Sequence, residues 1–254
     1  MKNSIDDVAV LLRRVDYGEA HVIVDLLTQA HGRVSLFARH ARKSTRRFAG
    51  GLEPFTQMRV RYQPGREGAL GSLQETESLR FFQGIVEEPL RLAAAAWLLS
   101  LIEGMTQAQQ GGDPFFSYVL AIFDWLHQVA SPQALACGML RAEVVLLQDA
   151  GVLASMHACQ QTGRSLDEMD AAIFRPGEGL VELSASRVGD QGVRLGAESL
   201  RLLEAVLSRR VVPTVTGAAL HPLREGLFAS WAGMLDHPPR TWSGWDQAIR
   251  AAIP

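Results

Sequence analysis

Hydrophobic and polar positions alternate along the first 80 residues with the period of two that is typical of β-strands. The clearest alternation runs from Phe55 to Tyr62, where Gln57, Arg59 and Arg61 face away from the hydrophobic side chains. Four other segments rich in strand-forming residues are 8–12, 22–28, 33–39 and 70–76. Turns that contain glycine separate these segments. Five short strands predict a small closed or nearly closed barrel.

Beyond residue 86 the hydrophobic positions recur at helical spacing instead. Asp113-Pro114 and Ser131-Pro132 each supply an N-cap followed by proline at the first helical position, and Gly151 ends a helix. The predicted helices are 87–108, 113–129, 132–150, 197–208, 222–235 and 242–249. Residues 157–194 show little periodicity, and we predict two short strands there, at 172–175 and 179–184.

The predicted fold class is therefore α+β. A five-stranded barrel at 1–80 precedes a helical domain at 81–254, which contains an irregular insert at about 155–194. No hydrophobic run reaches the length of a membrane span, and acidic residues occupy the place of a signal peptide's hydrophobic region. Cys137 and Cys159 are too few for a disulfide framework. We expect a cytoplasmic protein.

The net charge of −2 hides a positive first 80 residues and a negative remainder. Six cations without any acidic residue fall between positions 33 and 47, and they are Arg33, Arg39, Arg42, Lys43, Arg46 and Arg47. Such side chains bind phosphates without reading sequence. We predict that they bind nucleic acid together with His40 and the outward Arg59 and Arg61, aided by Ser44, Thr45 and a bend at Gly50-Gly51. The alternatives are a solvated loop and, for Arg59 and Arg61, charges that keep a strand soluble.

Three aromatic residues near the basic segment are candidates for stacking on bases: Phe37, Phe48 and Phe55. For Phe37 and Phe55 the strand pattern favours the barrel core instead. Cys137 falls on a predicted helix and is expected to be a small core residue.

The sequence contains neither a nucleophile elbow nor a phosphate-binding glycine loop. His157 and Cys159 are two possible zinc ligands where a structural site needs four. We therefore predict no catalytic residue, no metal and no cofactor, with an enzyme site in the insert as an alternative.

Several motifs occur in a characteristic order. Leu26-Leu27-Thr28 precedes Gly32-Arg33, the basic run Arg39-His40-Ala41-Arg42 follows, and Gly50-Gly51-Leu52-Glu53-Pro54-Phe55 comes next. In the helical part the segment 140–147, Leu-Arg-Ala-Glu-Val-Val-Leu-Leu, precedes Gly151. This layout, which covers the whole chain, resembles the RecO family of bacterial recombination mediators.

The resemblance implies an N-terminal OB-fold, a helical domain and an insert that in many members binds zinc. It implies binding of single- and double-stranded DNA in the nucleoid, annealing of complementary strands, contact with the acidic tail of single-stranded DNA-binding protein (SSB), and loading of RecA together with RecR. Three features depart from the family: His40 and Ala142 replace a small and an aromatic residue, and of the zinc cysteines only Cys159 is present. The insert is therefore expected to be zinc-finger-like but free of metal.

Arg141 lies in the matched helix motif and is the candidate that binds the acidic tail. The alternative is an ordinary surface charge. A different class of function also stays open: an OB-fold interaction module that binds acidic peptides and has no direct role at DNA.

Overall fold

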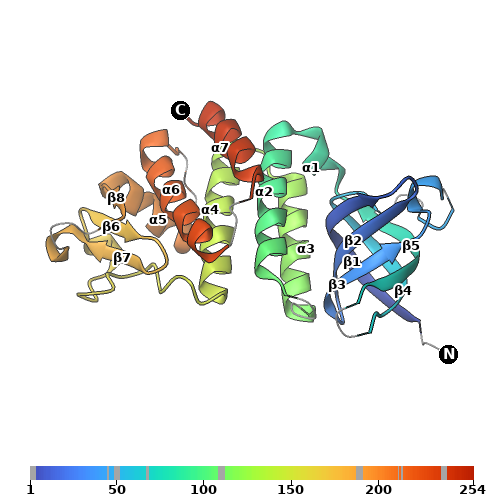
Figure 1. Ribbon diagram of the computed structural model, residues 1–254. Coiled ribbons are helices and arrows are strands. Elements are labelled where there is room, and N and C mark those ends of the chain that lie inside the picture. Colours follow the sequence, from blue (N-terminus) through green and yellow to red (C-terminus); the bar gives the residue numbers. More distant parts are fainter. Residues whose placement is uncertain are drawn as a thin grey trace. The chain divides into compact units, whose positions relative to one another are not determined.

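The computed structural model describes residues 4–44, 46–48, 52–66, 69–107, 112–186, 191–210, 212, 214–235 and 239–254 (Figure 1). Contacts divide the chain into two compact units. The first unit is Met1–Ala95 with Leu99–Gln128, and the second unit is Ala96–Leu98 with Val129–Pro254. The first unit thus groups helices with the barrel, while a domain boundary at residue 80 stays a prediction.

Five strands of the first unit form a closed barrel in the order β1-β2-β3-β5-β4 (Figure 1). They are β1 (Ile5–Tyr17), β2 (His21–Thr28), β3 (Gly32–Ala38), β4 (Thr56–Gln63) and β5 (Gly71–Phe81). β3 and β5 pair in parallel, the other neighbours pair antiparallel, and β1 closes the barrel against β4. This is the strand order of an OB-fold and confirms the predicted barrel.

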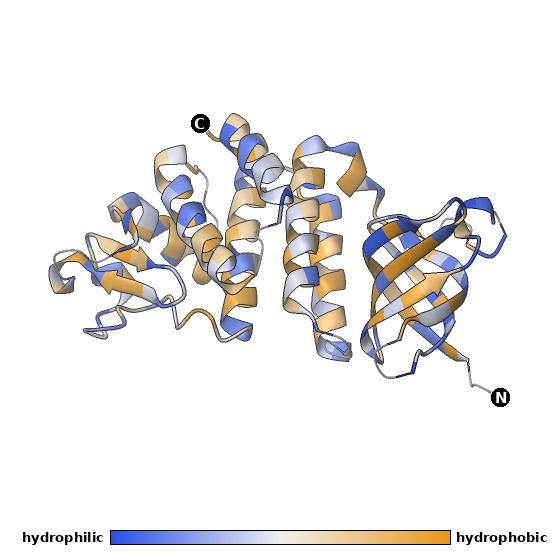
Figure 2. Ribbon diagram, in the orientation of Figure 1, coloured by the Kyte–Doolittle hydropathy of each residue, from blue (hydrophilic) through white to orange (hydrophobic). Residues whose placement is uncertain are grey.

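The barrel core follows the alternation in the sequence. On β4, Met58, Val60 and Tyr62 are buried as predicted, and hydrophilic and hydrophobic bands alternate over the strands in Figure 2. Phe48 and Leu52, from the connection between β3 and β4, also enter this core. The connection is therefore anchored inside the barrel, although it is rich in polar residues.

Several elements differ from the prediction. β1 and β5 run to Tyr17 and Phe81, beyond the predicted ends, because backbone pairing with neighbouring strands continues where the hydrophobic signal stops. α1 (Gln83–Glu87) and β8 (Val193–Leu195) were not predicted, since short elements carry little periodic signal. Pro222 does not begin a helix: it lies inside α6 (Gly217–Met234), whose N-cap is Thr216.

Helices α2 (Pro89–Met105) and α3 (Asp113–Gln128) complete the first unit. Phe123 of α3 contacts the rings of Phe55 and Phe82, with centroids 5.7 and 5.5 Å apart. Phe55 is therefore a core residue, as the strand pattern favoured.

Arg33 on β3 joins the barrel to the end of α2. Its Nη1 atom donates to the carbonyl oxygens of Glu103 and Thr106 at 2.8 and 2.7 Å, and its Nη2 atom donates to Asp25 at 3.0 Å. The last carbonyls of a helix lack partners within the helix and carry partial negative charge. The guanidinium of Arg33 is thus engaged at a helix end, which argues against the predicted contact of Arg33 with nucleic acid; that contact stays a prediction.

The second unit contains α4 (Pro132–Asp149), α5 (Ala197–Leu207), α6 and α7 (Thr241–Ala252). The insert forms a small sheet in the order β7-β6-β8 from β6 (Ala172–Arg175), β7 (Gly179–Glu182) and β8, with 3-10 turns at Leu166–Glu168 and Leu183–Ala185. The backbone amides of Thr162 and Glu182 donate to the Cys159 sulfur at 3.4 and 3.2 Å. Burial acts to raise the pKa of this thiol, but the amides outweigh it and lower the pKa.

Among the residues that the structure describes, no three His, Cys, Asp or Glu side chains gather to hold a metal ion. Across the same residues, no helix has the length and hydrophobicity that crossing a membrane requires.

A buried charge lies in the second unit, on α4. The side chain of Glu143 is 2% exposed, and Arg224 of α6 is 3% exposed. Arg224 donates to Asp246 at 2.8 Å and lies over the rings of Trp242 and Trp245 at 4.8 and 5.2 Å. Burial raises the pKa of Glu143 to about 7, although the charge of Arg224 opposes the shift.

We predict that replacing Glu143 by Gln removes a pH dependence of stability. Between the ordinary value of 4.5 and about 7, folded Glu143 binds more protons than unfolded Glu143, so the free energy of unfolding falls as pH rises. From pH 5 to pH 8, E143Q should gain about 2 to 3 kcal/mol relative to the wild type in urea unfolding followed by tryptophan fluorescence. The exposed Glu178→Gln is the control, and a constant difference across pH would contradict the prediction.

We also predict that Arg33→Ala destabilises the first unit by about 2 to 3 kcal/mol, because three acceptors in partly buried hydrogen bonds lose a charged donor. Urea unfolding and hydrogen exchange of residues 99–106 would measure the loss. Arg13→Ala is the matched control, because Arg13 makes only an exposed 3.7 Å pair with the same Glu103. A stable R33A variant with weakened DNA binding would instead restore Arg33 as a phosphate ligand.

Candidate nucleic-acid interface

The basic loop, residues 39–47, follows β3. Its second residue, His40, has a left-handed backbone (φ 59°), and the 3-10 turn Ala41–Lys43 follows. The His40 amide donates to His21 Nδ1 at 3.1 Å, and the Arg42 amide donates to the carbonyl of Ala20 at 3.1 Å. The loop is thereby held beside the start of β2.

The cations of the basic loop face solvent. Exposed side chains are Arg39, His40, Arg42, Lys43, Arg46 and Arg47. Arg39, Lys43 and Arg46 form no side-chain hydrogen bond or ion pair with any residue that the structure describes. Thr45, Gly50 and Gly51 lie outside the described residues. Free cations of this kind can contact phosphate without breaking an internal pair.

The remaining cations of the loop are partly engaged. Arg42 lies 3.7 Å from Asp16, in a pair between exposed groups. Arg47 donates to the carbonyl of Arg39 at 2.9 Å and lies over the ring of Phe48 at 5.1 Å. These contacts fix the direction of the loop and leave its charge at the surface.

Arg46 and Arg47 share a groove of about 610 Å³ with Arg59 and Arg61 of β4. Both strand arginines are paired, Arg59 with Glu77 at 2.6 Å and Arg61 with Asp6 and Glu75 at 2.8 and 2.7 Å. The hydrogen bond and charge of Asp6, followed by the charge of Glu75, raise the pKa of Arg61. The predicted cations are therefore brought together here, but Arg59 and Arg61 are already neutralised by carboxylates.

The aromatic candidates divide between core and surface. Phe48 and Phe55 are buried, at 6% and 3% exposure, so neither can stack on a base. Phe37 is half-buried and lies at the surface beside Tyr17 and His21. The sequence analysis missed Tyr17 and His21 because it placed Tyr17 in a turn. They are cross-strand partners in the β1–β2 hairpin.

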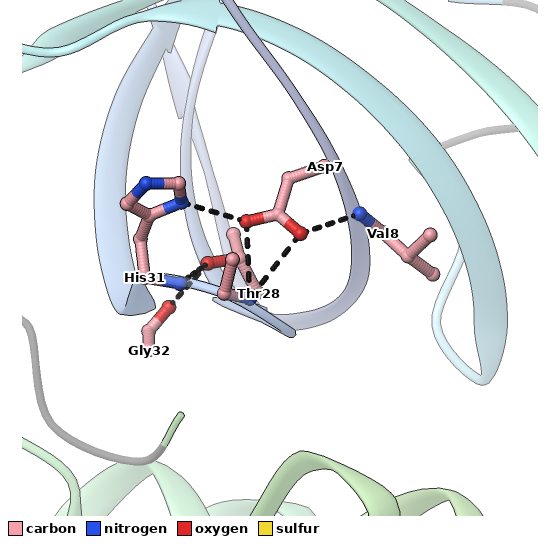
Figure 3. A network of polar contacts seen from close by, with 6 residues as sticks. Asp7, Val8, Thr28, His31 and Gly32 are labelled. Atoms are coloured by element: carbon pink, nitrogen blue, oxygen red, sulfur yellow. Dashed lines mark hydrogen bonds and ion pairs between the residues drawn. The ribbon is translucent and has the colours of Figure 1, made fainter. Parts of the chain in front are cut away.

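The opposite end of β2 is held by a separate polar network (Figure 3). The Asp7 carboxylate accepts hydrogen bonds from the amides of Val8 and Ala30 at 2.8 and 3.2 Å, and it lies 2.9 Å from His31 Nδ1. The Thr28 hydroxyl donates to the carbonyl of Gly32 at 2.9 Å. This network fixes the turn from which β3 starts and is structural.

Arg141 lies on α4 and is half-buried. Its guanidinium forms no hydrogen bond or ion pair with the described residues. The neighbouring Ala142 and Glu143 are buried, so Arg141 marks the edge between core and surface. A guanidinium in this position can form an ion pair with a carboxylate of a partner protein.

Comparisons with known proteins agree with this architecture. A family model described as "Recombination protein O N terminal" matches residues 1–82, and one described as "Recombination protein O C terminal" matches residues 86–216. A protein named "DNA repair protein RecO" from Anaeromyxobacter sp. (strain Fw109-5) is 35% identical over 172 residues, which span 67% of this chain and 65% of the relative.

Two further proteins with the same printed name are similar. The relative from Gloeobacter violaceus is 29% identical over 80% of this chain and 76% of its own length. The relative from Pelobacter propionicus is 32% identical over 67% of this chain and 68% of its own length. The two family models together match most of the chain, and it therefore belongs to the RecO family.

Proposed function

We propose that this protein is a non-catalytic DNA repair and recombination mediator whose basic loop binds single- and double-stranded DNA. The observation that carries the proposal is the group of exposed cations held beside an OB-fold barrel, three of which have no partner among the described residues. The name of the relatives, "DNA repair protein RecO", supports the same function.

The proposed mechanism is electrostatic. Cations that contact phosphates release counterions, which gives an affinity that depends on salt and is independent of base sequence. The same charges screen the repulsion between two strands while the strands find their register. Annealing therefore needs no bond to be made or broken by a protein side chain.

The loop residues do not contribute equally in this proposal. Arg39, Lys43 and Arg46 contact phosphate directly, while His40, Arg42 and Arg47 line the same surface. Arg59 and Arg61 form its edge, because a phosphate there has to compete with Asp6, Glu75 and Glu77. Arg33 is left out, since it caps α2.

The helical part is proposed to serve partner proteins. Arg141 would receive the acidic tail of SSB, and with RecR the protein would help load RecA onto SSB-coated strands in the cytoplasm, at the nucleoid. The unpaired guanidinium of Arg141 on the matched helix supports this assignment.

We predict that the triple variant Arg39→Ala, Lys43→Ala, Arg46→Ala loses DNA binding and strand annealing. The slope of log affinity against log salt should fall by about 2 to 3, because each lost phosphate contact removes about 0.7 to 0.9. Fluorescence anisotropy with labelled single strand and duplex would measure both quantities.

The matched control removes three exposed cations of the second unit, with Arg194→Ala, Arg201→Ala and Arg240→Ala. It lowers the net charge equally and should leave DNA affinity nearly unchanged. Equal losses in both triple variants would contradict the assignment of the basic loop.

We predict that Arg141→Ala weakens binding of a labelled acidic peptide corresponding to the SSB tail by about tenfold and leaves DNA affinity unchanged. Arg201→Ala serves as the control, at an exposed position of a different helix. If the peptide bound through the basic loop and DNA did not, the protein would instead be an interaction module for acidic peptides.

A further inference from the structure

A cluster of four rings lies on the outside of the barrel, next to the basic loop. We call Tyr17, His21, Phe37 and His40 the ring cluster. The rings of Tyr17 and Phe37 meet edge to face at 5.8 Å, His21 lies 5.2 Å from Phe37, and His40 lies 4.7 Å from His21. The four side chains thus form a continuous row of contacts.

Strand register explains how the cluster forms. Tyr17 of β1 pairs with His21 of β2, and Ile23 of β2 pairs with Phe37 of β3. These residues belong to the outer face of the three strands, since the alternating neighbours Val22 and Ala38 are fully buried in the barrel. His40 joins from the loop through the hydrogen bond that its backbone amide donates to the His21 ring.

Core packing does not account for the cluster. Tyr17 is 57% exposed, and its neighbour Val15 is 39% exposed. The other end of the same face is occupied within the first unit, where Arg33 joins Asp25 to the carbonyls at the end of α2. The ring cluster lies at the other end of this face, where none of the described helices makes such a contact over Tyr17.

Two cations, Arg39 and Arg42, lie close to the rings along the chain. Arg39 follows β3 directly, and the Arg42 guanidinium is held near Asp16, the residue beside Tyr17. A ligand that binds the rings would therefore lie near the guanidinium groups of Arg39 and Arg42. Flat rings next to phosphate-binding side chains fit single-stranded nucleic acid, because every base has a face that stacks and every link has a negative charge.

We propose that the ring cluster is a stacking platform for the bases of single-stranded DNA, and that it makes the barrel prefer unpaired strands to duplex. The proposal rests on the DNA-binding function proposed above and assigns residues to it. The outer face of strands β2 and β3 is where OB-folds commonly bind oligonucleotides. In a duplex the bases stack on one another, so the rings gain nothing from it.

The test compares ligands that differ only in their bases. The probes are an oligo-dT strand, an abasic strand of equal length, which keeps the phosphates, and a duplex. In the variant Tyr17→Leu, Phe37→Leu the side chains stay hydrophobic but lose their flat rings. Affinity for oligo-dT should fall about tenfold or more, since stacking contributes about 5- to 100-fold per base. Affinities for the abasic strand and the duplex, and the salt slope, should be unchanged.

The matched control is Phe81→Leu, an exposed ring, 45% accessible, at the opposite end of β5 from the residues that pair with β3. Circular dichroism and urea unfolding establish that each variant is folded.

A second variant, Tyr17→Trp, keeps a flat ring. It should bind oligo-dT at least as well as the wild type and show fluorescence quenching by oligo-dT that the abasic strand does not cause.

The measurements distinguish a failure of the stacking proposal from a failure of the DNA-binding proposal. If oligo-dT affinity is unchanged in the double leucine variant but lost in the basic-loop triple variant, the stacking proposal is wrong and the DNA-binding function stands. If all three probes weaken equally, the rings only support the loop, and stacking is again overturned. If the wild type binds no probe at low salt, both proposals fail.

Discussion

The first unit depends on the hydrogen bonds of the Arg33 guanidinium. One side chain donates to two carbonyl oxygens at the end of α2 and to a carboxylate on β2, and it thereby links β2, β3 and the helix. Asp25 is held in turn by the hydroxyl of Ser35. The charges compensate one another, which makes burial of these groups tolerable. The strand that begins at this anchor is the one that delivers the basic loop.

One end of the β2–β3 face is anchored to a helix, and the proposed DNA-binding surface lies at the other end. The loop is placed there by two hydrogen bonds that backbone amides donate, one to the His21 ring and one to the Ala20 carbonyl, and by the burial of Phe48 and Leu52. Its cations differ from those of β4 in their surroundings and not in their chemistry. Arg59 and Arg61 face carboxylates on neighbouring strands, whereas Arg39, Lys43 and Arg46 pair with no carboxylate in the part of the chain that the structure describes. Composition alone assigns all of them the same role.

Local patterns in the sequence predicted much of the fold. Alternation at Met58, Val60 and Tyr62 identified an inward face, and Ser131-Pro132 marked the start of α4, where the Ser131 side chain accepts from the Ala134 amide. The candidate site was harder to predict, because the contacts that define it join residues far apart in the sequence. The pairing of Arg33 with α2 joins positions about seventy residues apart. The contact between Tyr17 and Phe37 likewise depends on strand register across β2.

The free-energy cost of ordering His40 depends on the conformational freedom of the unfolded chain. Its left-handed backbone is a conformation that glycine adopts without strain, and other residues adopt it less readily. A glycine, however, has more conformational freedom to lose on folding, by roughly 0.5 to 1 kcal/mol. With histidine the strain of the turn is therefore offset by a smaller loss of entropy, as well as by the ring contact with His21. Before the barrel forms, His40 thus gives the basic loop fewer alternative conformations than a glycine at this position would.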